Sequence, residues 1–113
     1  MKINSQNAET GPAAFYSDDF RVTLHSHIPK LKSSTETTTL NVEPLEGYKY
    51  VGDFYGLLQY KNIPMHYHWL IMMMNGMISP CDYDGETLTF ILPNFMEVER
   101  IYTTYRSHLK LKT

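Results

Sequence analysis

The chain has 113 residues, which is enough for one hydrophobic core and leaves little for a second. Hydrophobic residues make up 42% and charged residues 19%, a balance typical of a globular domain and not of a disordered one. The formal net charge is −2 and no block of lysine or arginine occurs, which argues against a nucleic-acid-binding protein.

Residues 1–45 predict an N-terminal arm with a β-hairpin or an extended conformation. Residues 1–12 are polar and lack apolar side chains to offset the entropy of ordering, so we expect them to be mobile unless a neighbouring molecule fixes them. Residues 20–28 alternate apolar and polar side chains, the pattern of a half-buried strand, and Pro29 ends it. Residues 36–42 are rich in β-branched threonine and predict a second strand.

Residues 46–93 predict a strand, two helices and a second strand. The first strand is expected at 48–51, and Gly52-Asp53 then supplies a turn and a helix N-cap. A short helix follows over 54–60, and the Asn-Ile-Pro run at 62–64 ends it.

The clearest helix is predicted over residues 65–74. Trp69, Met72 and Met73 recur at helical spacing, and almost every position from 69 to 74 is apolar. Such a helix is expected to be buried on more than one side, and Gly76 suits the left-handed conformation that closes it. The longest apolar run, 69–74, is too short to cross a bilayer.

The last part of the chain predicts a strand and then a helix. Residues 87–92 predict the strand, which Pro93 ends. Residues 94–113 then predict a C-terminal amphipathic helix, because its apolar side chains recur every three or four positions: Phe95, Val98, Tyr102, Tyr105 and Leu109. The predicted fold class is therefore α+β.

Few residues are arranged for catalysis or metal binding. His25 and His27 would share one face of a strand, but no third ligand stands at a diagnostic spacing. The acidic residues at 82, 84 and 86 fit turn chemistry better than a calcium loop. Cys81 lies beside Asp82, which would raise the pKa of its thiol and disfavour catalysis, and as the only cysteine it favours an intracellular site of assembly. We expect no enzyme activity, no cofactor and no metal.

Three short motifs within residues 48–93 resemble the LysM module. They are Tyr-Lys-Tyr-Val-Gly-Asp at 48–53, Asn-Gly-Met-Ile at 75–78, and Gly-Glu-Thr-Leu-Thr-Phe-Ile-Leu-Pro at 85–93. The chain departs from glycan-binding LysM modules in its first helix, where Phe-Tyr-Gly-Leu replaces small and aliphatic residues. Trp69 before an Ile-x-x-x-Asn-Gly stretch is similar to the LysM-like domain of baseplate wedge proteins in tailed bacteriophages.

This resemblance implies a LysM-like β-α-α-β core at 46–93, flanked by the arm and the C-terminal helix. It implies a structural component of the tail or baseplate of a phage virion, assembled in the host cytoplasm. Expected partners are other phage tail or baseplate proteins and further copies of the chain, with no nucleic acid and no membrane span. The predicted partner interface consists of large side chains: Tyr55, Tyr67, Trp69, Met73, Phe95, Tyr102 and Tyr105.

The alternative is a LysM module that binds peptidoglycan or a chitin-type glycan. Sugar rings would then stack in a groove beside the first helix. The residues predicted to line it are Gly52, Asp53, Phe54, Tyr55, Met77 and Ile78.

Overall fold

The computed structural model describes the backbone of residues 11–112 and the side chains of residues 13–108. The expected mobility of residues 1–10 therefore lies outside the described part. In chain order, with η for a 3₁₀ helix, the elements are η1 (Gly11–Tyr16), α2 (Asp18–Ser33), β1 (Thr38–Asn41), α3 (Pro44–Lys49), α4 (Phe54–Tyr60), η2 (Met65–Tyr67), α5 (His68–Met74), η3 (Pro80–Asp82), β2 (Thr89–Leu92) and α6 (Phe95–Lys112). This mixture of helices with an antiparallel sheet confirms the α+β class.

The strand predicted over 20–28 is wrong, because these residues belong to helix α2. Phe20, Leu24 and Leu31 are buried, and their spacing places them on one helical face, whereas Val22 is 70% exposed. Pro29 lies inside the helix instead of ending it. An interior proline costs roughly 3 kcal/mol, and the burial of three large side chains at about 1.5–3 kcal/mol each outweighs that cost.

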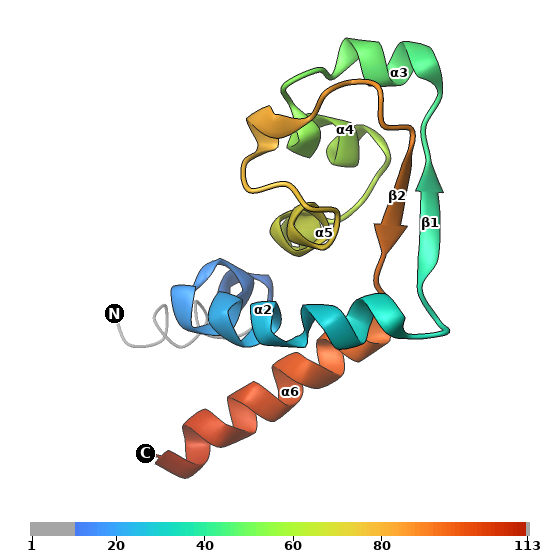
Figure 1. Cartoon of the computed structure of the whole chain (residues 1–113). Coiled ribbons are helices and arrows are strands. Elements are labelled where there is room, and N and C mark those ends of the chain that lie inside the picture. Colours follow the sequence, from blue (N-terminus) through green and yellow to red (C-terminus); the bar gives the residue numbers. More distant parts are fainter. Residues whose placement is uncertain (1–10, 113) are drawn as a thin grey trace.

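The strand predicted over 36–42 is confirmed as β1, but its partner is not residues 20–28. β1 pairs antiparallel with β2, with Thr38 opposite Leu92 and Asn41 opposite Thr89. The predicted strand over 87–92 is likewise confirmed as β2. The two-stranded sheet therefore joins segments that are far apart in the chain, which run side by side in Figure 1.

The strand predicted over 48–51 is also wrong, because helix α3 occupies residues 44–49. Glu43 and Glu46 form a capping box, and Pro44 stands in the first turn, where its missing N–H costs nothing. Gly47 lets α3 approach the loop beneath it, since a Cβ at this position would lie 2.6 Å from the carbonyl oxygen of Gly85. Between the two paired strands the chain thus carries three α-helices and not two.

The predictions for the next two helices are confirmed. Asp53 caps α4 by accepting a hydrogen bond from the N–H of Gly56 at 3.0 Å. The helix expected over 65–74 is found as η2 followed by α5, and Gly76 has the expected positive φ of 82°. The α5 side chains Leu70, Ile71, Met72 and Met74 are at most 1% exposed, so α5 is buried on more than one side as predicted.

Asn75 fixes the end of α5 to the sheet. Its side-chain nitrogen donates to the carbonyl oxygens of Ile71 at 2.8 Å and Ile91 at 3.0 Å. Its side-chain oxygen accepts from the N–H of Ile91 at 2.8 Å. At Ile91, the backbone groups of β2 that point away from β1 are thus both satisfied by one amide side chain.

The elements are arranged with α5 at the centre of the fold. α2 packs against α5 and α6, while α4 and β2 contact α5 from other sides. α3 lies at one end of the molecule and α6 at the other, as Figure 1 shows. α6 begins at the predicted place, and the N-cap residue Asn94 accepts from the N–H groups of Met96 and Glu97. No helix of the described chain is long and apolar enough to cross a membrane.

Candidate functional site

The residues predicted for a partner interface divide into buried and partly exposed groups. Tyr67 and Tyr102 are 8% and 7% exposed and belong to the hydrophobic core, so the folded chain does not present them to a partner. The remaining five are partly buried against the same core: Tyr55, Trp69, Met73, Phe95 and Tyr105. The sequence shows that the chain is rich in tyrosine, but it does not show which tyrosines lie in the core and which lie at the surface.

Tyr67 illustrates the structural role that some of these aromatic residues have. Its hydroxyl donates to Glu99 Oε2 at 2.6 Å, and its ring packs against Phe15 and Phe95. Burial, followed by the hydrogen bond to the carboxylate, raises the pKa of Tyr67 well above its usual value. This tyrosine holds η2 to α6 and is not arranged for chemistry.

Arg21 brings the partly exposed aromatic residues of three elements together. Its guanidinium carbon lies 5.0 Å from the centroid of the Trp69 ring and 5.9 Å from that of Tyr16. Its Nε donates to the carbonyl oxygen of Phe15 at 3.2 Å. Burial raises the pKa of nearby Tyr55, while Arg21 opposes the shift. The Arg21 guanidinium therefore already has two aromatic rings and a backbone carbonyl of the same chain as partners.

The residues predicted for a glycan groove do not all face solvent. Phe54 is fully buried and packs against Tyr83 and Phe90 at the core, so its ring is not available to stack on a sugar. Asp53 is engaged as the N-cap of α4. Ile78 is 81% exposed, whereas Gly52, Tyr55 and Met77 are partly exposed.

His68 and Asp84, two of the titratable residues considered for chemistry, make hydrogen bonds to the backbone. His68 is buried, and its Nε2 lies 2.8 Å from the carbonyl oxygen of Ile63. Burial lowers the pKa of His68 and of His66. Asp84 accepts from the N–H groups of two following residues, as the turn interpretation predicts. Within the described residues, no three histidine, cysteine or acidic side chains are close enough to hold a metal ion.

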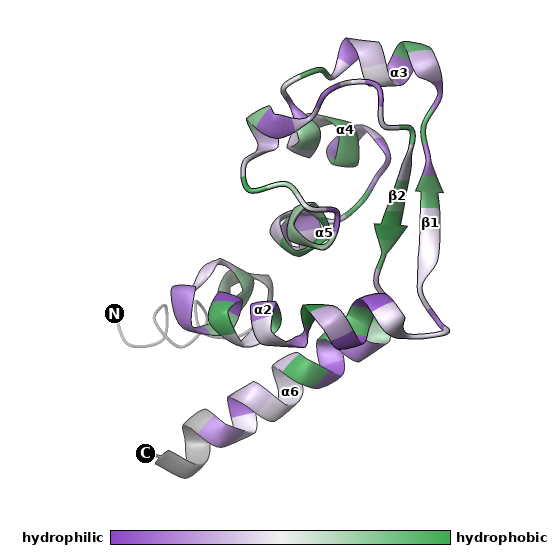
Figure 2. Ribbon diagram, in the orientation of Figure 1, coloured by the Kyte–Doolittle hydropathy of each residue, from purple (hydrophilic) through white to green (hydrophobic). Residues whose placement is uncertain are grey.

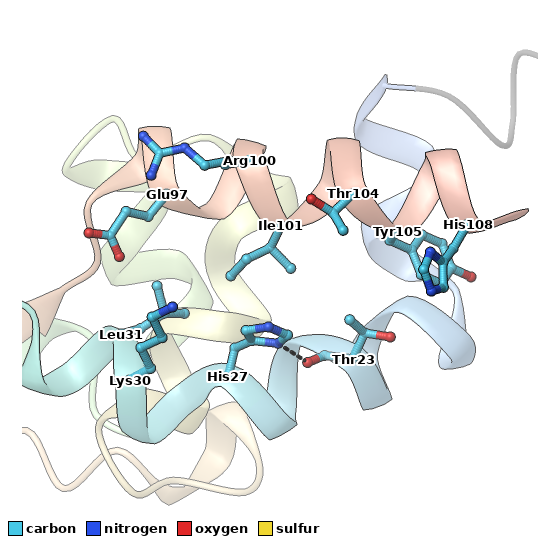
Figure 3. A pocket seen from close by; sticks show the side chains of 10 residues that line it. All are labelled: Thr23, His27, Lys30, Leu31, Glu97, Arg100, Ile101, Thr104, Tyr105 and His108. Atoms are coloured by element: carbon cyan, nitrogen blue, oxygen red, sulfur yellow. Dashed lines mark hydrogen bonds between the residues drawn. The ribbon is translucent and has the colours of Figure 1, made fainter.

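A groove of about 410 Å³ runs between α2 and α6 (Figure 3). Leu31 is buried and Ile101 partly buried, so apolar side chains contribute to its wall. Lys30 on α2 and Arg100 on α6 are exposed cations from its two facing helices. The other residues that line this α2–α6 groove are Thr23, His27, Glu97, Thr104, Tyr105 and His108.

Helix α3 exposes two large apolar side chains at the opposite end of the fold. Leu45 is 83% exposed and Tyr48 is 79% exposed, and their spacing of three places them on one face of the helix. We call these two side chains the α3 tip; α3 and its position above α4 are seen in Figure 2. They make up a surface that a partner could bury.

Sequence reasoning missed both the groove and the α3 tip. The groove was missed because residues 20–28 were interpreted as a strand, which separates His27 from Lys30 and hides their common helical face. The α3 tip was missed because residues 48–51 were interpreted as a strand. A signal for α3 was present in the Glu-Pro-Leu-Glu run at 43–46, which combines a proline in the first turn with a capping glutamate.

No family model, no curated protein and no solved structure matches this chain.

Proposed function

We propose that this chain is a non-enzymatic assembly protein of a tailed-phage virion, which joins neighbouring tail or baseplate subunits through a LysM-like domain. The motifs at 75–78 and 85–93 support the LysM-like part of the proposal. A pair of strands on either side of a helical segment fits it in outline, although the first strand lies at 38–41 and not at 48–51, and three α-helices instead of two lie between the strands.

The observation that carries the assembly role is the exposure of Leu45 and Tyr48 on α3. Complete burial of such side chains contributes roughly 1.5–3 kcal/mol each, and tyrosine is enriched among interface residues that dominate binding. In the isolated chain both side chains face water, where they contribute nothing comparable. A partner that covers them would recover this free energy.

The first test is cross-linking mass spectrometry on purified virions. Lys49 is exposed on α3 and Lys61 follows α4, so an amine-reactive reagent would report on proteins close to the α3 tip. We expect cross-links from these lysines to tail or baseplate proteins. Absence of the chain from purified particles would contradict the proposal. Titration of the isolated chain with chitin oligomers would then test the glycan-binding alternative.

A variant pair makes the same test specific. Replacing Leu45 and Tyr48 by serine should reduce incorporation into particles, because it removes the apolar anchors while leaving core residues unchanged. Val22→Ser removes a similarly exposed apolar side chain from α2 and serves as the control. Equal incorporation of both variants would show that the α3 tip is not the contact surface.

A further inference from the structure

The two ends of the fold differ in charge. Residues 43–49 and 83–88, which are α3 with its cap residue and the loop packed beneath it, contain four acidic residues and one basic residue, Lys49, a formal charge of −3. One of these acidic residues, Glu46, is paired with Lys61 at 2.7 Å. Glu43 and Glu86 are exposed near α3, so the α3 tip is surrounded by net negative charge.

The α2–α6 groove has the opposite character. Lys30 and Arg100 are its exposed cations. The acidic residue among its lining side chains, Glu97, accepts a hydrogen bond from Ser34 Oγ at 3.0 Å, which occupies part of its carboxylate. A groove with an apolar wall and an exposed cation on each of its two helices suits an apolar group that carries acidic neighbours.

We propose that the α3 tip of one copy docks into the α2–α6 groove of a second copy, head to tail. Leu45 and Tyr48 would enter the groove against Leu31 and Ile101, and the acidic residues around α3 would face the cations of the next copy. The two side chains together contain fewer atoms than a drug-sized ligand, and a cavity of about 410 Å³ lies in the range that holds such ligands.

The contact is heterologous, because the two surfaces differ and lie at opposite ends of the molecule. Each copy therefore keeps one unused tip and one unused groove, so association continues beyond a dimer until a ring closes or a filament grows. The inference names one partner for the assembly role and rests on that proposed function.

Sedimentation velocity of the full chain over a concentration series tests the proposal. We expect the weight-average sedimentation coefficient to rise with concentration, and to rise less at high salt because the charges are exposed. The tip variant, with Leu45→Ser and Tyr48→Ser, should associate at least about tenfold more weakly. The groove variant, with Lys30→Glu and Arg100→Glu, should be weakened by a similar factor.

Mixing the two variants gives the decisive result. The tip variant keeps an intact groove and the groove variant keeps an intact tip, so an equimolar mixture should form a 1:1 heterodimer and no longer species. A variant with Lys32→Glu and Arg106→Glu has the same change in charge on exposed residues outside the groove, and should associate like the natural chain.

Several outcomes would overturn the head-to-tail contact. If the tip variant or the groove variant associates as strongly as the natural chain, the contact does not join a tip to a groove. If the mixture of the two variants forms no heterodimer, the contact instead joins two identical surfaces. A natural chain that stays monomeric at all concentrations, yet is cross-linked to other proteins in virions, would refute the inference and leave the proposed function intact. A chain that self-associates head to tail but is absent from virions would support the inference and refute the proposed virion function.

Discussion

Replacing Asn75 by alanine should destabilise the fold by about 2–4 kcal/mol. Asn75 is the hydrogen-bond partner of both backbone groups of Ile91, at 2.8 Å and 3.0 Å. In the antiparallel register Ile91 stands opposite Thr39, and the bonds to Asn75 show that its N–H and C=O point away from β1. The substitution therefore leaves two backbone groups of a central segment without their partner.

The magnitude follows from the cost of leaving polar groups unpaired. An unsatisfied buried donor or acceptor costs about 1–3 kcal/mol. Ile91 is only partly buried, so water can reach its backbone in part and each group is expected near the lower half of that range. The third bond, to the carbonyl oxygen of Ile71, matters less because this oxygen also accepts from the N–H of Asn75.

Urea denaturation and hydrogen exchange together measure the effect. The Asn75→Ala variant should unfold at lower urea concentration with an unchanged m value, and the Ile91 amide should lose its protection. Asn41→Ala, at an exposed position of β1, is the matched control and should change stability by less than about 0.5 kcal/mol. A loss below about 0.5 kcal/mol for Asn75→Ala, with Ile91 still protected, would show that the Asn75 side chain does not stabilise this edge of β2.

Three further substitutions or conditions test the corrected fold. Pro29→Ala should raise stability in thermal unfolding by about 1–3 kcal/mol, because it restores an N–H within α2. Gly47→Ala should lower it by about 1–3 kcal/mol, because its Cβ would meet the Gly85 carbonyl oxygen at 2.6 Å. Burial lowers the pKa of His66 and His68 in the folded chain. As the pH falls, these histidines therefore bind protons in the unfolded chain before they do so in the folded one, which favours unfolding. Stability measured by denaturation should therefore fall as the pH falls below about 6.5.

Each of these expectations has a result that contradicts it. No gain from Pro29→Ala would show that the ring itself contributes packing that offsets the lost hydrogen bond. For Gly47→Ala, the exposed Leu45→Ala on the same helix is the control, and equal effects would argue against the close approach. For the pH dependence, His68→Gln should give a shallower decline, and an unchanged slope would remove the buried histidine as its cause.

Local signals explain which elements were predictable. The helix over 65–74 combines apolar side chains at helical spacing with Gly76, which suits the left-handed conformation that closes a helix. Asp53 and Gly56 are neighbours in sequence, so the cap of α4 was already present in the local pattern. β2 lies between the turn at 84–85 and Pro93, which bound a short β-branched run.

Residues 20–28 show why a local pattern cannot distinguish a strand from a helix when the spacing of the apolar residues fits both. Phe20 and Leu24 lie four positions apart, which fits both a strand face and a helix face. Leu31 decides in favour of the helix, because burying it requires the chain to continue past Pro29 in helical form. That choice depends on α5 and α6, against which α2 packs, and neither contact is visible in the sequence of α2 itself.

The α+β class, the buried helix at 65–74, the cap of α4 and the strand at 87–92 can be predicted from the sequence, since each depends on residues a few positions apart. The pairing of β1 with β2, the place of Tyr67 and Tyr102 in the core, and the groove between α2 and α6 become visible once the chain is folded. Those features join residues distant in the chain, and their free energy comes from apolar surface buried between whole elements.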